Sequence, residues 1–112
     1  MELIKHYSKE DYGDFTGFME VNGLAYARAY TFNDDKTTFY LDSLSVCENV
    51  RGLGYGTELQ KVREKIAKEK GYKYTMLWVK KWTWMRKWYK RRGYNYYKPY
   101  KAENAVWLRK KL

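Results

Sequence analysis

The chain has 112 residues, which fits a single domain around one hydrophobic core. Its one cysteine, Cys47, and one histidine, His6, exclude an internal disulfide and a metal site built from clustered Cys and His ligands. Lys and Arg number 23 against 13 Asp and Glu, so the formal net charge of +10 favours an anionic ligand or partner.

The first part of the chain has the pattern of antiparallel strands. Residues 2–7 are expected to form a short strand, and the capping-box spacing of residues 8–11 predicts a helical turn after it. Strands are also predicted at residues 15–21 and 24–32, because the Asn-Gly pair between them is a strong signal for a two-residue hairpin.

A turn at residues 33–36 leads to a third strand of this group at residues 37–46, which is rich in β-forming side chains. Because side chains alternate between the two faces of a strand, its apolar residues are expected to divide between the faces. One face would carry Phe39, Leu41 and Ser43, and the other Tyr40, Leu44 and Val46.

The second part of the chain alternates helices with strands. Apolar residues recur at helical spacing over about residues 57–70 and about residues 83–92, which predicts two helices. Further strands are predicted at residues 74–80, 94–97 and 104–109. The inward residues are expected to be Leu59, Val62, Ile66 and Ala67 on the first helix and Met85, Trp88 and Tyr89 on the second.

The order of these elements and the composition together define the expected class. They predict an α+β fold in one domain spanning residues 1–112, with helices packed on a mixed, mainly antiparallel sheet and one strand–helix–strand crossover. No apolar stretch approaches the roughly 20 residues of a membrane helix, and the start of the chain lacks the apolar region of a signal peptide. With a free thiol, this predicts a cytoplasmic protein.

Charge divides the sequence into an acidic and a basic half. Residues 1–50 hold four Lys or Arg against nine Asp or Glu, a net of −5, whereas residues 51–112 hold nineteen against four, a net of +15. Between Glu69 and Glu103 there are eleven Lys or Arg and no acid, interleaved with four tryptophans and seven tyrosines. A solvated face explains such a run, and so does a surface that binds nucleic acid through cations and stacking rings.

Three glycines follow the predicted strand at residues 37–46. Gly52, Gly54 and Gly56 lie where a strand must turn into a helix, and glycine permits positive φ and the close approach of another group. The first N–H groups of a helix have no intrahelical partner, so the turn is suited to bind a pyrophosphate. It is not a Walker loop, since no Gly-Lys-Ser/Thr follows, nor the dinucleotide fingerprint, whose strand opens a parallel unit.

The turn resembles the signature Arg/Gln-x-x-Gly-x-Gly/Ala of the GNAT family of acetyl-CoA-dependent N-acetyltransferases. Arg51, Gly54 and Gly56 stand at the specified positions. Two later stretches are also similar to family landmarks. Residues 88–94 (WYKRRGY) match the usual aromatic-Tyr-x-x-x-Gly-aromatic stretch, and residues 105–112 match the closing strand.

The resemblance, which extends over roughly residues 15–112, implies a GNAT fold and an acyltransferase that moves an acetyl group from acetyl-CoA to a primary amine of a protein or small molecule. Backbone N–H groups of the Gly-rich turn would hold the pyrophosphate, and the end of the preceding strand would pair with the pantetheine arm. The residues so implied in acetyl-CoA binding are Leu44, Ser45, Val46, Arg51, Gly52, Leu53, Gly54, Tyr55, Gly56 and Thr57.

The resemblance also implies that Tyr89 is the general acid that protonates the departing CoA thiolate. A core aromatic is the alternative for this residue. The acceptor amine must lose a proton before it attacks, because a lysine-like amine is almost wholly protonated at pH 7. Asp42, in the strand before the Gly-rich turn, is the first candidate for the base and Glu48 the second, with ordinary surface acids as the alternative for both.

Two departures from the family pattern concern the acceptor. Trp82 stands where many relatives have asparagine, and few residues separate the first two predicted strands, where the family usually has two helices. We therefore expect an open site, with a macromolecular acceptor or a groove completed by a second copy of the chain as a homodimer. The alternative function is a non-catalytic or nucleic-acid-directed GNAT-fold protein that binds DNA or RNA through its basic aromatic half.

The remaining aromatic and thiol side chains have simpler interpretations. Trp82, Trp84 and Trp88 recur at helical or near-helical spacing, which favours core packing over a shelf for a stacked ligand. Cys47 is expected to fill a small buried space rather than act as a nucleophile, and His6 to lie on the surface.

Overall fold

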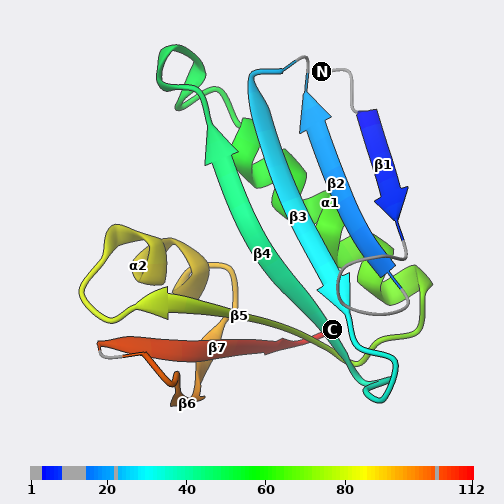
Figure 1. Ribbon diagram of the computed structural model, residues 1–112. Coiled ribbons are helices and arrows are strands. Elements are labelled where there is room, and N and C mark those ends of the chain that lie inside the picture. The colour runs from blue at the N-terminus through cyan, green and yellow to red at the C-terminus, as the bar shows by residue number, and fades with distance from the viewer. Residues whose placement is uncertain (1–3, 9–14, 22, 103) are drawn as a thin grey trace.

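The computed structural model describes residues 4–8, 15–21, 23–102 and 104–112. These residues contain one mixed sheet with the strand order β1-β2-β3-β4-β5-β7-β6 (Figure 1). The strands are β1 (Ile4–Ser8), β2 (Phe15–Val21), β3 (Ala25–Thr31), β4 (Thr38–Val46), β5 (Tyr74–Lys80), β6 (Asn95–Pro99) and β7 (Ala105–Lys111). The helices are α1 (Tyr55–Glu69) and α2 (Trp84–Lys90), with a 3-10 turn at Glu48–Val50.

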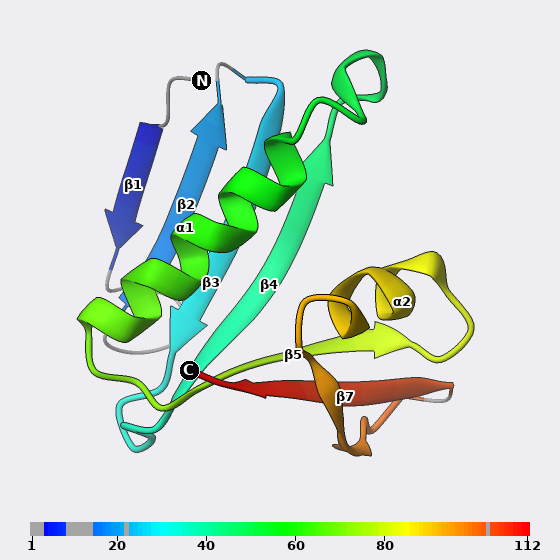
Figure 2. The same ribbon diagram turned by 180° about the vertical axis from the view of Figure 1, so that it is seen from behind.

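Antiparallel pairing dominates the sheet. The first four strands form a meander, and α1 crosses over from β4 to bring β5 parallel to it. Seen from behind, α1 lies across the face of β2 to β4, and α2 lies near the end of β5 (Figure 2). The predicted α+β class, with a mainly antiparallel sheet and one crossover, is confirmed.

The parallel pairing between β4 and β5 is short. Residues 38–40 of β4 pair with residues 74–76 of β5, and no later pair joins the two strands in the described part of the chain. Beyond this point the strands diverge (Figure 1), because β5 pairs along its whole length with β7. One edge of β4 after Tyr40 therefore pairs with β3, while no described strand lies beside the other edge.

A bulge in β4 changes which of its side chains share a face. Between the paired positions Leu41 and Leu44, β4 has two residues where β3 has only Arg28. The extra residue shifts the alternation, so Leu44 and Val46 point to the same side as Leu41 and pack against the core. The prediction that Leu44 and Val46 lie on the face opposite Leu41 is therefore wrong.

The hydrophobic core lies between the helices and the sheet. The small inward side chains of β3 are alanines, which let α1 lie close to the strands. The apolar face predicted for α1 is confirmed at Leu59, Ile66 and Ala67, while Val62 is only partly buried. The same helix also buries two polar side chains, Gln60 and Arg63, which apolar periodicity did not reveal.

Most predicted elements are found close to their predicted bounds. The strand at residues 74–80 is found as predicted, and α1 begins two residues before its predicted start because left-handed Gly54 is its N-cap. Only residues 9–14 separate β1 from its partner β2, which fits the shortened N-terminal region, and the helical turn predicted from residue 8 falls mostly on residues outside the described ones. No described helix is long and apolar enough to cross a membrane.

Candidate active site

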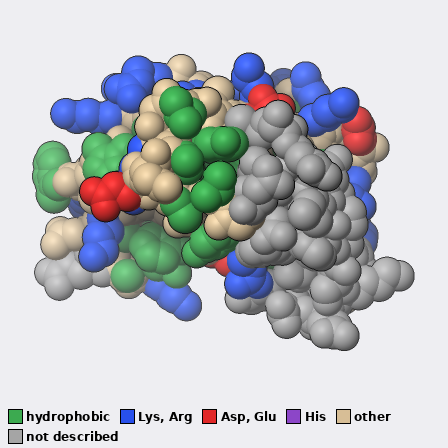
Figure 3. Space-filling model, turned by 90° about the horizontal axis from the view of Figure 1, so that it is seen from above, with side chains coloured by type: hydrophobic (Ala, Val, Ile, Leu, Met, Phe, Trp, Pro, Cys, Tyr) green, Lys and Arg blue, Asp and Glu red, His purple; other side chains and the backbone are tan. Residues whose placement is uncertain are grey.

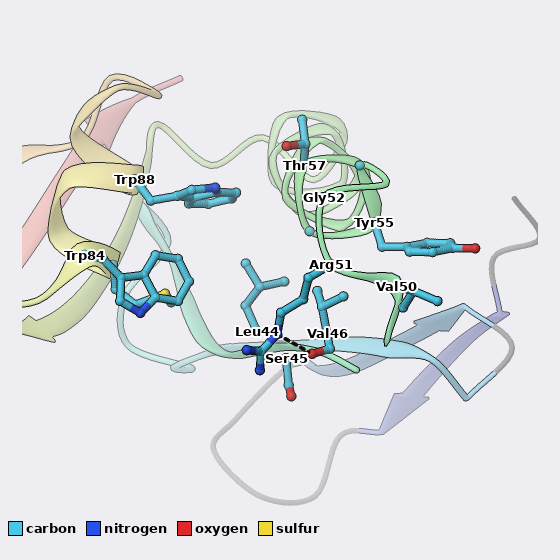
Figure 4. A pocket seen from close by; sticks show the side chains of 13 residues that line it. Leu44, Ser45, Val46, Val50, Arg51, Gly52, Tyr55, Thr57, Trp84 and Trp88 are labelled. Carbon is cyan, nitrogen blue, oxygen red and sulfur yellow. Dashed lines mark hydrogen bonds between the residues drawn. The ribbon is translucent and has the colours of Figure 1, made fainter. Parts of the chain in front are cut away.

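A cavity of about 520 Å³ lies where three elements meet. The end of β4 forms one side, the Gly-rich turn and the first turn of α1 form the second, and α2 forms the third (Figure 4). The lining residues are Leu44, Ser45, Val46, Val50, Arg51, Gly52, Gly54, Tyr55, Gly56, Thr57, Trp84, Met85 and Trp88.

The end of β4 gives the cavity an unpaired strand edge. Leu44 and Val46 point toward the space between α1 and α2, while the side chain of Ser45 points to the opposite side of the strand (Figure 4). Because β5 has already diverged, backbone groups on this edge can pair with an extended ligand as though it were a further strand.

The Gly-rich turn presents backbone rather than side chains to the cavity. Gly52 and Gly54 have φ of +83° and +89°, a left-handed conformation that L side chains rarely adopt. No described side chain caps the N-terminus of α1, so its first N–H groups face outward with the positive end of the helix dipole. The Arg51 side chain folds back and donates from Nε to the carbonyl oxygen of Val46 at 3.2 Å.

Gly56 keeps the space between β4 and α2 open. A Cβ at this position would lie 3.6 Å from Cγ2 of Val46 and 3.9 Å from Cζ2 of Trp88. Both distances are ordinary van der Waals contact, so a methyl group fits, but a longer side chain would project into the gap between these residues. The glycine thus preserves a cradle that most other side chains would fill.

Arg92 holds two walls of the cavity together. Its guanidinium carbon lies 3.6 Å from the centroid of the Trp88 ring, and it donates to the Trp88 carbonyl oxygen and to Oγ1 of Thr57, both at 3.0 Å. Burial, followed by the neighbouring Arg91 cation, lowers the pKa of Arg92, although an arginine keeps its charge. Through these contacts the end of α2 is attached to the first turn of α1.

Tyr89 is buried beside the β4 bulge and is not among the residues that line the cavity. Its hydroxyl accepts a hydrogen bond from Nη2 of Arg63 at 3.0 Å. The Arg63 side chain is fully buried and also donates from Nη1 to the carbonyl oxygens of Arg28 at 3.0 Å and Ser43 at 3.2 Å. The phenol is therefore held close to Ser43, the residue before Leu44 of the cavity.

The acidic candidates lie on the surface, outside the cavity lining. Asp42 has one carboxylate oxygen 3.8 Å from Nη1 of Arg28, and its side chain is about one-third exposed. Glu48 begins the 3-10 turn and is exposed. The neighbouring Cys47 is also exposed, with its thiol 3.9 Å from the carbonyl oxygen of Gly23, so the prediction of a buried filler is wrong.

A model of the acetyltransferase (GNAT) family matches residues 3–94, which is most of the chain. The chain belongs to the GNAT acetyltransferase family. The resemblance seen in the Gly-rich turn and in residues 88–94 is thereby confirmed. A comparison with curated protein sequences found no match.

Solved structures of other GNAT proteins share the fold. A GNAT acetyltransferase from Elizabethkingia anophelis with acetyl-CoA bound is 14% identical, with a TM-score of 0.71 and 98% of each chain covered. An acetyltransferase from Bacillus cereus is 24% identical, with a TM-score of 0.66, 99% of this chain and 74% of that chain covered. The PaiA N-acetyltransferase of Thermoplasma acidophilum in complex with coenzyme A is 16% identical, with a TM-score of 0.71, 87% of this chain and 60% of that chain covered.

The structure of this GNAT domain brings most of the sequence-predicted site residues together. Of those predicted to bind acetyl-CoA, all but Leu53 line the one cavity, and Leu53 is 66% exposed at the tip of the turn. Tyr89 and Asp42 lie outside the lining, one buried beneath the β4 bulge and the other on its exposed side.

Sequence reasoning missed the exposure of two tryptophans, Trp84 in the α2 wall and Trp82 just before α2. Trp82 and Trp84 are 86% and 70% exposed, so the core-packing prediction is wrong for both, whereas Trp88 packs partly against the core. Spacing shows which side chains share a helix face, but in a helix of seven residues it does not show how far that face is covered. Arg63 was also missed, because a charged residue inside an apolar stripe gives no periodic signal.

Proposed function

We propose that this GNAT domain is an acetyl-CoA-dependent N-acetyltransferase that transfers an acetyl group to a primary amine. One observation carries the proposal: a single cavity joins an unpaired strand edge to a glycine turn at an uncapped helix N-terminus. A long ligand with a hydrogen-bonding arm and a pyrophosphate fits both features at once. Two similar solved structures described with acetyl-CoA or coenzyme A bound support the same ligand here.

The residues present fit acetyl-CoA in their chemistry. Backbone N–H groups of the turn from Gly52 to Thr57 would hold the pyrophosphate, because glycine leaves them uncovered and the helix dipole favours negative charge there. The Arg51 N–H already donates to the carbonyl oxygen of Glu48 at 3.3 Å. The backbone of residues 44–46 would pair with the amides of the pantetheine arm. Trp84 and Trp88 on α2 would close the opposite side and exclude water (Figure 4).

Acetyl-CoA supplies an activated acetyl thioester, and the rest of the chemistry is proton transfer. A neutral amine attacks the thioester carbon, so that a C–N bond forms, the C–S bond breaks, and an amide and free coenzyme A result. The amine loses one proton and the coenzyme A thiolate accepts one. The chain must therefore provide a proton donor near the sulfur and a base near the amine.

We assign the proton donor to the Tyr89 hydroxyl. Arg63 holds this hydroxyl at the β4 bulge, next to the inner end of the strand edge that lines the cavity. The Arg63 guanidinium can only donate hydrogen bonds, so it occupies an acceptor position of the Tyr89 phenol oxygen. The O–H of Tyr89 is therefore directed away from Arg63. Arg63 acts here as a positioning residue.

The base is assigned to Asp42, with Glu48 as the second candidate. Asp42 lies on the solvent side of the bulge, so an acceptor could reach it without passing the cavity that binds acetyl-CoA. With only residues 9–14 between β1 and β2, the acceptor side has room for a macromolecular amine. We place the protein in the cytoplasm, where the exposed thiol of Cys47 would stay reduced.

The test is titration calorimetry with acetyl-CoA on the native chain and two variants of Gly56. Gly56→Ala is expected to bind acetyl-CoA with near-native affinity, because its methyl group meets only ordinary contacts. Gly56→Leu is expected to lose at least about tenfold in affinity, which is about 1.4 kcal/mol, because its side chain fills the cradle.

Both variants place a helix-forming residue in the first turn of α1, so both are expected to remain folded. Release of free thiol in the presence of primary amines then measures turnover. Absence of heat at millimolar acetyl-CoA in a folded native sample would contradict the proposed function, and equal affinity of the Ala and Leu variants would contradict the location of the site.

A further inference from the structure

A second cavity, of about 630 Å³, lies between α2 and the β6–β7 hairpin and has no part in the proposed acetyl transfer. We call it the α2–β6 groove. Its lining combines cations with aromatic rings and includes no Asp or Glu among the described residues. The lining residues are Lys81, Trp82, Thr83, Trp84, Arg86, Lys87, Lys90, Tyr94, Asn95, Tyr96 and Leu108.

Three rings of the groove are open to solvent. The exposed fractions of Trp82, Trp84 and Tyr96 are 86%, 70% and 55%, and the two indoles are the most exposed large hydrophobic side chains described. Exposed indoles contribute little to the core, and their grouping in one hollow is typical of an interaction surface. Figure 3 shows one face of the molecule, on which hydrophobic side chains gather beside separate Lys and Arg side chains.

The cations of the groove are not neutralised within the described chain. Lys81, Arg86, Lys87 and Lys90 all line it, and none forms an ion pair with a described carboxylate. They come from the acid-free segment between Glu69 and Glu103, so the sequence around them carries no compensating charge. Such a cluster attracts a polyanion.

We propose that the α2–β6 groove binds single-stranded nucleic acid. Unpaired bases offer flat faces that stack on indole and phenol rings, and the phosphates between them pair with Lys and Arg. A duplex offers phosphates to the cations, but its bases are stacked on one another and cannot stack on the rings. An acidic peptide likewise offers negative charge to the cations but no bases to stack on the rings. The proposal goes beyond the acetyl transfer and does not depend on it.

The groove adjoins the acetyl-CoA cavity through one shared residue. Trp84 lines both cavities, so a substitution of Trp84 would affect both sites and could not tell them apart. Trp82, Lys87 and Lys90 line only the groove, and they therefore make suitable probes.

The first experiment measures fluorescence anisotropy of a labelled oligothymidylate of about 12 nucleotides, within the usual site size of small single-strand-binding domains. Trp82→Ala is expected to weaken binding about fivefold or more, and Trp82→Phe, which keeps a ring, to retain most of the affinity. The same oligonucleotide in a duplex is expected to bind more weakly than the single strand.

The second experiment follows the salt dependence of the same binding. The double variant K87A/K90A is expected to reduce the slope of log K against log salt by about 1.4, which corresponds to two phosphate contacts on a single strand. The matched control K61A/K68A removes the same charge from exposed positions of α1 that line neither cavity and is expected to leave that slope unchanged.

Three results would overturn the proposal. They are no binding at low salt, equal affinity for single strand and duplex, and equal effects of K87A/K90A and K61A/K68A on the slope of log K against log salt.

Calorimetry with coenzyme A is a separate experiment. K87A/K90A is expected to bind coenzyme A as the native chain does, and a marked loss would assign the groove to the nucleotide end of coenzyme A instead. Failure of acetyl-CoA binding in the native chain bears only on the proposed function.

Discussion

At the scale of single residues, Arg63 connects several buried polar groups of the described chain. Its guanidinium donates to two carbonyl oxygens at the β4 bulge, to Oε1 of Gln60 at 2.6 Å and to the Tyr89 hydroxyl. None of these partners is a carboxylate, and Nε has no partner among the described residues. A buried cation is thus stabilised by dipoles alone, which ties its conformation closely to the bulge.

Replacing Arg63 with Met is expected to lower the free energy of unfolding by about 3 kcal/mol or more. The substitution leaves several buried acceptors without donors, and each costs about 1–3 kcal/mol. Urea unfolding measures the change. Arg91→Met serves as the control, because Arg91 is exposed and a change below about 0.5 kcal/mol is expected there. Equal losses in the two variants would show that the buried contacts of Arg63 have little effect on stability.

Replacing Tyr89 with Phe is expected to lower kcat by about 100-fold or more while the KM for acetyl-CoA stays near its native value. The hydroxyl is the proposed proton donor, yet it does not line the cavity. Steady-state release of free thiol measures both constants. Native turnover in Tyr89→Phe would reduce this residue to a packing role.

Tyr94→Phe is the matched control for Tyr89→Phe. The Tyr94 hydroxyl is also buried and bonds to Gln60, Thr75 and Glu64. Burial, followed by the Glu64 carboxylate, raises the pKa of Tyr94 far above its ordinary value, so this phenol stays protonated. Loss of the Tyr94 hydroxyl is expected to lower the free energy of unfolding by about 1–3 kcal/mol without changing the mechanism of turnover.

At the scale of elements, the turn between β3 and β4 is organised by Asp35. Its Oδ1 accepts from the Thr37 amide at 2.9 Å, the Thr37 hydroxyl at 2.8 Å and the Thr38 amide at 3.1 Å, and Oδ2 accepts from the Tyr40 hydroxyl at 3.4 Å. Burial alone would raise the pKa of Asp35, but these hydrogen bonds outweigh it and hold the pKa below its ordinary value. The turn is therefore most stable when Asp35 is ionised.

Replacing Asp35 with Asn is expected to lower the free energy of unfolding by about 1 kcal/mol at pH 7, because charge-assisted hydrogen bonds are lost. A carboxyl whose folded pKa is depressed stabilises the fold above its unfolded pKa of about 3.9, and this contribution disappears as pH falls through the folded value. The two proteins should therefore converge in stability below about pH 4.

Chemical unfolding between pH 3 and pH 7 measures this convergence. Asp34→Asn at the exposed neighbouring position is the control, with an expected change below about 0.5 kcal/mol. A constant difference between native chain and Asp35→Asn at all pH values would show that the carboxylate charge plays no part in the turn.

The sequence predicted which helices and strands exist better than it predicted their geometry. The strand at residues 74–80 and the hairpin of β2 and β3 were predictable, because alternation and turn chemistry are local. The two-residue loop was wrong in length, since the pairing of Val21 with Ala25 leaves three residues between the strands. The bulge in β4 was not predictable, because one extra residue in a strand leaves no mark in an otherwise regular apolar pattern. It reversed the faces expected for Leu44 and Val46, and with them one side of the cavity.

At the scale of the whole molecule, the sequence predicted the backbone part of the site but not its surroundings. The glycine turn was predictable, since left-handed positions and a following helix have a short-range signal. The short overlap of β4 with β5 and the exposure of Trp82 and Trp84 were not, because they depend on how distant elements pack.

The short overlap of β4 with β5 divides the sheet into two parts. One part holds β1 to β4 and the other β5 to β7, and only three parallel residue pairs link them within the described sheet. A compound that binds between the two parts contacts both of them, and it raises the melting temperature according to its concentration relative to its Kd. Thermal melting thus offers a screen for cofactor analogues that requires no knowledge of the acceptor.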